Sequence, residues 1–211
     1  MIARRLLFGT VAAAAAAAGV AAGLYLDSSG DDQPEIGGYV LERPRTLPTL
    51  VLVDEQAAAF GAGDFAGHWS FLYFGYTYCP DVCPLTLVEL AEVKRRLAIE
   101  RPEERVEYYL ISVDPRRDTP ARLREYVAYF DPAFRGLTGT DAALAALANA
   151  TDTLFDVPEG QDANNYLVSH SSNLVVLDPA GAVRAVLTPP HHSARLAADF
   201  GRIATHYAAH R

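Results

Sequence analysis

Residues 69–97 read WSFLYFGYTYCPDVCPLTLVELAEVKRRL. Residues 69–74 form a continuous aromatic and aliphatic run, which is typical of a buried central strand. Residues 75–84 hold both cysteines of the chain and two prolines, and residues 85–97 repeat apolar side chains at helical spacing. This stretch therefore predicts a buried strand, a turn that carries the cysteines, and a helix.

Strands and helices alternate downstream of this stretch. Residues 106–113 predict the next strand, and Thr119 and Pro120 suit the N-cap and first position of a helix that runs to residue 130. An alanine-rich helix, a β-hairpin and a last helix are expected at residues 141–150, at residues 174–187 and from residue 193. We expect an α/β domain with a mixed central sheet flanked by helices, of which a thioredoxin-like fold is one example. The order of elements alone does not single out that fold.

Residues 1–26 are predicted to be an N-terminal membrane anchor. After Arg4 and Arg5, residues 6–26 carry no charge, and a helix of this length crosses a hydrocarbon core. Acidic residues follow, so the positive-inside rule leaves the N-terminus in the cytoplasm. In a bacterium the chain would be a single-pass inner-membrane protein with its C-terminal domain in the periplasm. A cleaved signal peptide or a twin-arginine signal is the alternative, and each exports the domain.

The remaining chain divides into a linker and one domain. Residues 27–48 are rich in Asp, Gly, Pro and Ser and predict a linker, which leaves residues 49–211 as the globular domain. A net charge of −8 without an extended basic stretch argues against a nucleic-acid surface. Two cysteines are too few for a scaffold built on disulfides, and 50% hydrophobic residues favour a packed core.

The cysteine pair is the strongest functional signal. Cys79 and Cys83 are four residues apart at the start of the predicted helix, so their sulfurs share one face and can form a disulfide or hold one soft metal ion. A helix N-terminus stabilises thiolates, which favours both redox chemistry and metal ligation. An inert structural disulfide is the alternative, although it would close a very small loop.

A metal site needs a third ligand, and histidine is the best candidate because Met1 is the only methionine. His170 lies in a polar stretch just before a predicted strand, although a loop histidine bonded to the backbone is the alternative there. We expect His68, His206 and His210 at the surface, and the adjacent His191 and His192 would need an irregular backbone to bind one ion. Two cysteines and one histidine suit copper(I), whereas zinc would require a fourth donor.

Three motifs carry a resemblance to a known family: FGYTYCPDVCP at residues 74–84, ISVDPRRDTP at residues 111–120 and YLVSHS at residues 166–171. Together they resemble the Sco/SenC family over about residues 49–187. The resemblance implies a membrane-anchored copper chaperone with a thioredoxin-like fold that acts in assembly of the CuA centre of cytochrome c oxidase. It also implies that Cys79 and Cys83 are copper ligands and a redox pair, with His170 as the third ligand.

The chain also departs from the family pattern. Ser169 occupies a position where the family often has an aspartate, which affects the expected surroundings of His170, and Tyr78 replaces a more usual residue. Asp114 and Asp118 match a family motif. We expect them to have a structural role, ending a strand and starting the next helix.

Two functions fit these residues. The first is a metallochaperone, not an enzyme, that passes copper(I) or copper(II) to the CuA domain of cytochrome c oxidase subunit II. The second is a thiol-disulfide oxidoreductase that reduces the CuA cysteines with Cys79 and Cys83 as its redox pair. Other periplasmic copper chaperones or thiol reductants are further expected partners. A peroxidase is disfavoured, because Thr77 lies two residues before Cys79 and the peroxidase motif has threonine three residues before its cysteine.

Overall fold

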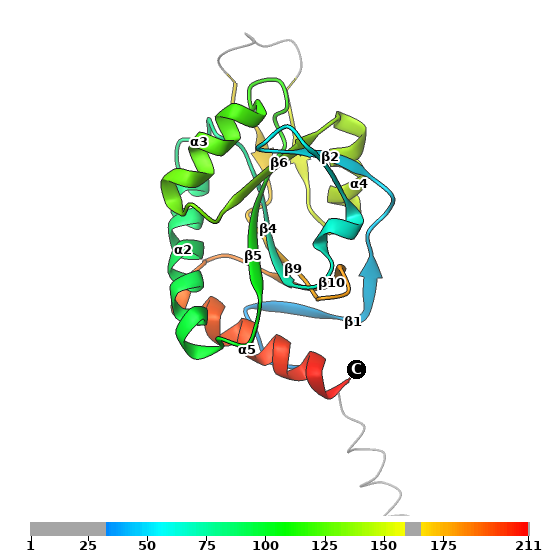
Figure 1. Ribbon diagram of the computed structural model, residues 1–211, viewed down its shortest axis with the longest axis vertical. Helices are drawn as coiled ribbons and strands as arrows, with labels where there is room; N and C mark the ends of the chain where they lie inside the picture. Colours follow the sequence, from blue (N-terminus) through cyan, green and yellow to red (C-terminus); the bar gives the residue numbers. More distant parts are fainter. Residues whose placement is uncertain (1–32, 159–165, 211) are drawn as a thin grey trace, which may run out of the picture. The chain divides into compact units, whose positions relative to one another are not determined.

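The computed structural model describes residues 33–158 and 166–210 (Figure 1). Its strands are β1 (Gly38–Thr46), β2 (Val51–Asp54), β3 (Ala59–Gly61), β4 (Trp69–Gly75), β5 (Val106–Ser112), β6 (Arg135–Gly139), β7 (Phe155–Asp156), β8 (Ser169–His170), β9 (Leu174–Leu177) and β10 (Ala182–Leu187). Its helices are η1 (Ala62–Phe65), α2 (Val82–Glu100), α3 (Pro120–Phe130), α4 (Asp141–Ala150) and α5 (Ser193–Ala209). The alternation of strands and helices that the sequence predicts is confirmed.

The central sheet is mixed. Its strand order is β1-β10-β9-β4-β5-β6-β2-β3, and β7 and β8 form a separate two-stranded ribbon. Strands β4, β5 and β6 run parallel, whereas β9, β10, β1, β2 and β3 pair antiparallel with their neighbours. The domain is therefore a thioredoxin-like α/β fold with a mixed sheet, as the sequence predicts.

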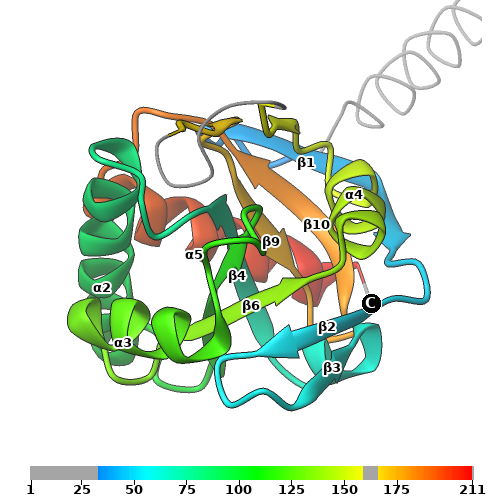
Figure 2. The ribbon, with the colours of Figure 1, turned by 90° about the horizontal axis from the view of Figure 1, so that it is seen from above.

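Strand β4 lies at the centre of the core. All of its residues are buried, and it pairs with β5 on one side and with β9 on the other. Helix α2 packs against α5 and α3, whereas α4 contacts β2 and β6. In both views strands β4, β6 and β9 lie between α2 and α3 on one side and α4 on the other (Figures 1 and 2). The apolar run at residues 69–74 is thus buried because sheet neighbours and helices surround it.

Helix starts follow the local sequence. The Thr119 hydroxyl accepts a hydrogen bond from the Arg122 N–H, and Pro120 is the first residue of α3. Thr140 caps α4 in the same way through the Ala143 N–H. These caps satisfy backbone donors that a helix N-terminus leaves unpaired.

The linker prediction for residues 27–48 is wrong for Gly38–Thr46, which forms β1 and pairs antiparallel with β10. Most of β1 is exposed, so its sequence lacks the alternation that marks a half-buried strand. Pro44 falls where the register shifts between Val40 and Arg45, and proline is tolerated at such a bulge of an edge strand.

The predicted anchor at residues 1–26 lies outside the described residues. Within residues 33–158 and 166–210, no helix combines the length and the apolar character that a membrane span requires.

Candidate metal centre

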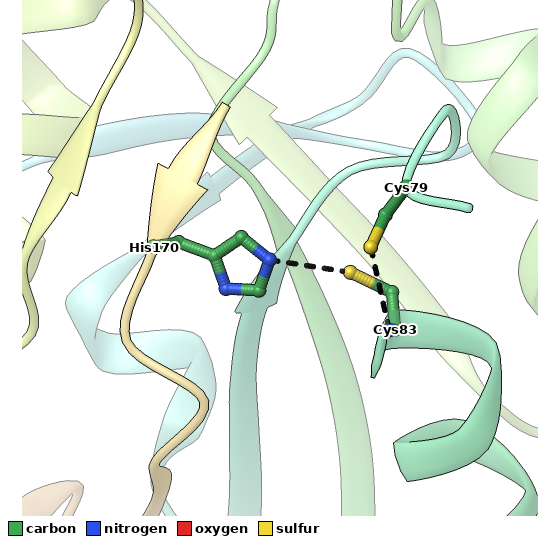
Figure 3. A group of neighbouring side chains, drawn as sticks. All are labelled: Cys79, Cys83 and His170. Atoms are coloured by element: carbon green, nitrogen blue, oxygen red, sulfur yellow. Dashed lines mark hydrogen bonds between the residues drawn. The ribbon is translucent and has the colours of Figure 1, made fainter. Parts of the chain in front are cut away.

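The cysteines lie at the junction between β4 and α2 (Figure 3). A turn closed by a hydrogen bond from the Cys79 N–H to the Tyr76 carbonyl follows β4, and α2 begins at Val82. Cys83 therefore lies in the first turn of α2 and Cys79 just before it, as predicted. His170 reaches the same point from β8. The site lies beside the carboxyl ends of the parallel strands β4 and β5, where ligand sites of α/β sheets usually form.

The side chains of Cys79, Cys83 and His170 converge on one point. Their ligand atoms all lie within 4.8 Å of one another, and Cys83 Sγ lies 3.4 Å from His170 Nε2. Metal bonds of about 2.0–2.3 Å place the donors of a trigonal site about 3.5–4 Å apart, so small side-chain rotations suffice to close this group around an ion. The donor set of two sulfurs and one imidazole fits a soft ion.

The two thiols have opposite electrostatic environments. A hydrogen bond from the Cys83 thiol, with contributions from His170 and from the Asp81 and Cys83 backbone, lowers the pKa of Cys79 from 9.0 to about 4 despite partial burial. The Cys83 N–H, at the N-terminus of α2, points at Cys79 Sγ from 3.5 Å. The hydrogen bond to Cys79, followed by burial, raises the pKa of Cys83. At neutral pH the pair therefore consists of a half-buried Cys79 thiolate and a buried Cys83 thiol.

His170 is held with one ring nitrogen toward the cysteines. Its Nδ1 lies 3.2 Å from the Ser171 carbonyl, which only accepts hydrogen bonds, so Nδ1 carries a proton and Nε2 is the ring nitrogen that faces the cysteines. The rings of Tyr73 and Tyr76 each meet the imidazole edge-on at 6.0 Å. The pairing of His170 with Phe155 sets the register of the β7–β8 ribbon. Nε2 is therefore the ring nitrogen oriented for ligation.

Ser169 lies next to an acidic residue of another strand. In the β7–β8 ribbon its Cα partner is Asp156, and both side chains are exposed. Residues directly opposite in an antiparallel pair share one face, whereas His170 projects from the other face. The carboxylate near this position thus comes from β7 instead of β8.

Gly75 allows the Cys83 sulfur to approach the backbone of β4. A Cβ atom at this position would lie 2.9 Å from Cys83 Sγ and 3.2 Å from Tyr73 Cε1. Real Cβ atoms essentially never come as close as 2.9 Å to another atom, so any larger residue would displace the sulfur. The glycine that directly follows the buried run is therefore part of the site.

Asp118 ties the cysteine turn to the end of β5. Its buried carboxylate accepts hydrogen bonds from the Thr77 N–H at 2.9 Å, the Thr77 hydroxyl at 2.6 Å and the Ser112 hydroxyl at 2.6 Å. Burial raises the pKa of Asp118, and these hydrogen bonds oppose the shift. The expected local role of Asp118 is thus incomplete, because it also fixes a turn 41 residues earlier in the chain. The motif at residues 111–120 identifies Asp118 but does not indicate its contact with Thr77.

The expectation that His68 lies at the surface is wrong. Its side chain is buried just before β4, and its Nε2 lies 3.0 Å from the Tyr109 hydroxyl. It lies at the opposite end of β4 from the cysteines, and burial lowers its pKa below the ordinary 6.5. No local sequence pattern indicates the contact with Tyr109.

The other histidines also lie outside the cysteine group. His191 Nε2 contacts the Ser172 carbonyl at 2.6 Å, His192 is exposed, and the rings of His206 and His210 lie 4.2 Å apart near the end of α5. Among the residues that the structure describes, Cys79, Cys83 and His170 are the one group of three side chains arranged to hold an ion.

Comparison with known proteins gives one consistent family. The family model described as SCO1/SenC matches residues 41–205. A putative copper-binding protein of Stutzerimonas stutzeri is 39% identical over 151 residues, which cover 72% of this chain and 73% of that protein. The mitochondrial protein SCO2 homolog of Bos taurus is 36% identical over 130 residues, which cover 62% of this chain but 49% of the bovine protein. This chain thus spans about half the length of that mitochondrial relative.

Solved structures agree with these matches. Copper-bound ScoI of Arabidopsis thaliana is 28% identical with a TM-score of 0.71, and the match covers 77% of this chain and 99% of that one. Copper-bound ScoI of Bradyrhizobium japonicum is 31% identical with a TM-score of 0.63, covering 74% and 98% of the two chains. The similarity therefore extends over the described domain and includes proteins solved with copper.

Proposed function

The chain belongs to the SCO1/SenC family, and on that premise we propose that it is a copper(I) chaperone whose ligands are Cys79, Cys83 and His170. The observation that carries the proposal is the convergence of these three donors within 4.8 Å. Two sulfurs and one neutral imidazole suit copper(I), whereas zinc would need a fourth donor. The copper-bound ScoI structures support copper as the cargo.

The difference between the two sulfurs favours release by ligand exchange. Cys83 is buried beneath the turn, whereas Cys79 is half-buried and more accessible to an acceptor. An acceptor thiolate would therefore approach from the Cys79 side, while Cys83 and His170 retain the ion until a second acceptor ligand arrives. We propose the CuA domain of cytochrome c oxidase subunit II as the acceptor, which is the target that the family resemblance implies.

We propose that the domain acts in the periplasm, held by residues 1–26 at the inner membrane. The support is the uncharged run after Arg4 and Arg5 together with the acidic residues that follow it. In this oxidising compartment the cysteines need copper or a reductant to remain free of a disulfide. A periplasmic thiol reductant, or another copper chaperone that supplies the ion, is therefore a proposed partner.

A thiol-disulfide oxidoreductase is the second candidate, and the unequal thiol pKa values favour it. The Cys79 thiolate would attack a disulfide of the acceptor, forming a mixed disulfide and releasing one acceptor thiolate. Cys83 would then pass its proton to the acceptor thiolate already released and displace the second acceptor thiolate, which leaves a Cys79–Cys83 disulfide. Two electrons pass to the acceptor, and an external dithiol must reduce the chain again.

Copper(I) titration separates the two candidates. The reduced full chain is titrated without oxygen against a chromophoric competitor, beside Cys79→Ser, Cys83→Ser and His170→Ala. We expect one tightly bound copper per chain, lost with either cysteine and weakened about tenfold or more without His170. The exposed His192 gives a matched control, since His192→Ala leaves the three donors intact. Weak binding that does not depend on His170 would contradict the chaperone and favour the oxidoreductase.

A further inference from the structure

Arg117 has a buried guanidinium close to the metal centre. It lies in the loop between β5 and α3, and its side chain is 7% exposed. Its Nε donates to the fully buried carboxylate of Asp114, so the charge is paired. Two of its three nitrogens, Nε and Nη1, are hydrogen-bonded, whereas the buried Nη2 has no hydrogen-bond partner among the described residues. Two directed hydrogen bonds from one planar guanidinium fix its position.

Arg117 holds the segment that leads to His170. The Arg117 Nη1 donates to the Tyr166 carbonyl at 3.0 Å, and the guanidinium lies 3.5 Å from the centre of the Tyr166 ring. The Tyr166 hydroxyl donates in turn to Asp114. The backbone and the side chain of Tyr166 are thus both fixed four residues before His170.

Arg117 also lies near two aromatic side chains of the cysteine turn. The guanidinium lies 4.9 Å from the ring centre of Tyr78 and 5.6 Å from that of Tyr76. The Tyr76 hydroxyl accepts a hydrogen bond from the Val168 N–H at 3.2 Å, and the Tyr76 ring packs edge-on against His170. The same aromatic cluster therefore contacts both segments that supply metal ligands.

These contacts link ligands that are far apart in the chain. Cys83 and His170 are separated by 87 residues, and β8, which carries His170, pairs over only two residues with β7. We propose that Arg117 is a positioning residue that holds His170 in register with the cysteine pair. The inference rests on the proposed function, since it concerns the same copper(I) site.

Arginine suits this role better than lysine. Its fork donates to Asp114 through Nε and to the Tyr166 carbonyl through Nη1, while the planar group lies over the Tyr166 ring. Lysine keeps the charge opposite Asp114 but is a single point donor without a flat face. Arg117→Lys should therefore retain the ion pair and lose the link between the two segments.

The test is a double-mutant cycle with His170 in the reduced full chain. Copper(I) affinity is measured by competitor titration for the wild type, Arg117→Met, His170→Ala and the double variant. If Arg117 acts through His170, Arg117→Met weakens binding about tenfold in the wild type, by no more than His170→Ala does, and less than about twofold in the His170→Ala background. A merely structural role would weaken binding equally in both backgrounds, and that result would overturn the inference.

Two further variants keep the test decisive. Arg116→Met changes the exposed neighbouring arginine and should leave copper(I) affinity unchanged. If Arg117→Met does not fold, Arg117→Lys enters the same cycle, with an expected loss of about tenfold that also disappears without His170. If His170→Ala alone leaves the affinity of the wild type unchanged, the proposed copper site itself is contradicted. If only the coupling to Arg117 is missing, that site stands and the positioning role does not.

Discussion

Two polar clusters lie at opposite ends of β4, and they differ in how their groups are satisfied. At the end where β4 begins, His68 and its neighbours line a cavity of about 410 Å³. Here the polar groups pair with one another. His68 Nε2 lies 3.0 Å from the Tyr109 hydroxyl, and Arg135 forms an ion pair with Asp54 at 2.9 Å. We call this group the His68 end.

At the other end of β4, three potential ligand atoms, Cys79 Sγ, Cys83 Sγ and His170 Nε2, converge on one point. The donors of Cys79, Cys83 and His170 share one small volume, and His170 uses its other nitrogen to bind the backbone. Both ends are thus polar, but only the cysteine end leaves ligand atoms facing a common point. Convergence of lone pairs, and not polarity, distinguishes a metal centre from an internally paired cluster.

The largest expected effect concerns the Cys79 thiolate. Because its pKa is lowered from 9.0 to about 4, Cys79 should stay ionised when the pH falls from 9 toward 4, whereas an ordinary thiol would be about a thousandth ionised near pH 6. Alkylation of the reduced, metal-free full chain by iodoacetamide, followed by mass spectrometry as a function of pH, measures this directly.

The Cys83 thiol provides the control for that prediction. Its hydrogen bond is the largest cause of the lowered Cys79 pKa, so Cys83→Ala should move the alkylation midpoint of Cys79 upward. His68→Gln, at the other end of β4, should leave the midpoint unchanged. An alkylation midpoint near pH 9 in the wild type would contradict the asymmetry of the pair.

The next largest effect is expected for Gly75→Ala. The new Cβ would lie 2.9 Å from Cys83 Sγ, so the sulfur must move, and copper(I) affinity should fall about 10- to 100-fold. Overpacking should also lower the free energy of unfolding by about 1–3 kcal/mol. Gly63→Ala is the matched control near the His68 end, because nothing lies within 4 Å of its Cβ position. Equal copper(I) affinities for the two variants would show that the close approach at Gly75 is unimportant.

A smaller effect on copper is expected from Asp118→Asn. An amide offers donors where the Thr77 and Ser112 groups also donate, so the free energy of unfolding should fall by about 1–3 kcal/mol. Copper(I) affinity should fall about tenfold, because the freed Thr77 loosens the turn that carries Cys79.

Asp178→Asn is the counterpart of that variant. Asp178 is also buried, but it accepts from the Ala180 and Ala182 N–H groups in the turn between β9 and β10. That turn contacts the Gly67 N–H, next to His68. Both variants should be destabilised in urea unfolding, but only Asp118→Asn should lose copper(I) affinity. A similar loss for Asp178→Asn would mean that general destabilisation explains the effect.

Much of this fold follows from local sequence patterns. The buried run of β4, the cap formed by Thr119 and Pro120, and the hairpin of β9 and β10 are each encoded within a few neighbouring residues. The cysteine pair could be predicted for the same reason, since a spacing of four places two side chains on one helical face. His170 could be predicted as the third ligand, because two thiolates require a further soft donor and because His170 lies in the family motif at residues 166–171.

The parts that could not be predicted depend on distant partners. Strand β1 exists because β10 pairs with it, and its exposed residues carry no periodic signal. The link from Asp118 to Thr77 spans 41 residues, as does that from His68 to Tyr109. The difference between the two thiol pKa values likewise depends first on the hydrogen bond between the sulfurs and then on their unequal burial, both of which the folded turn sets. Spacing identifies groups on one element, whereas the contacts between elements appear only in the folded chain.

The smallest effect on copper is expected from His68→Gln, which tests the His68 end itself. Glutamine can still accept from the Tyr109 hydroxyl, so the free energy of unfolding should fall by about 1 kcal/mol and copper(I) affinity should change less than about twofold. Because burial lowers the pKa of His68, the unfolded state takes up a proton before the folded state does as the pH falls below 6.5.

The wild type should therefore lose stability on acidification through this histidine, and its advantage over His68→Gln in urea unfolding should shrink between about pH 8 and about pH 5. If the stability difference between the wild type and His68→Gln is constant over this range, His68 has the same pKa in the folded and unfolded states. A drop in copper(I) affinity as large as that expected for Gly75→Ala would contradict the independence of the two ends of β4. It would mean that the His68 end is energetically coupled to the copper ligands at the other end.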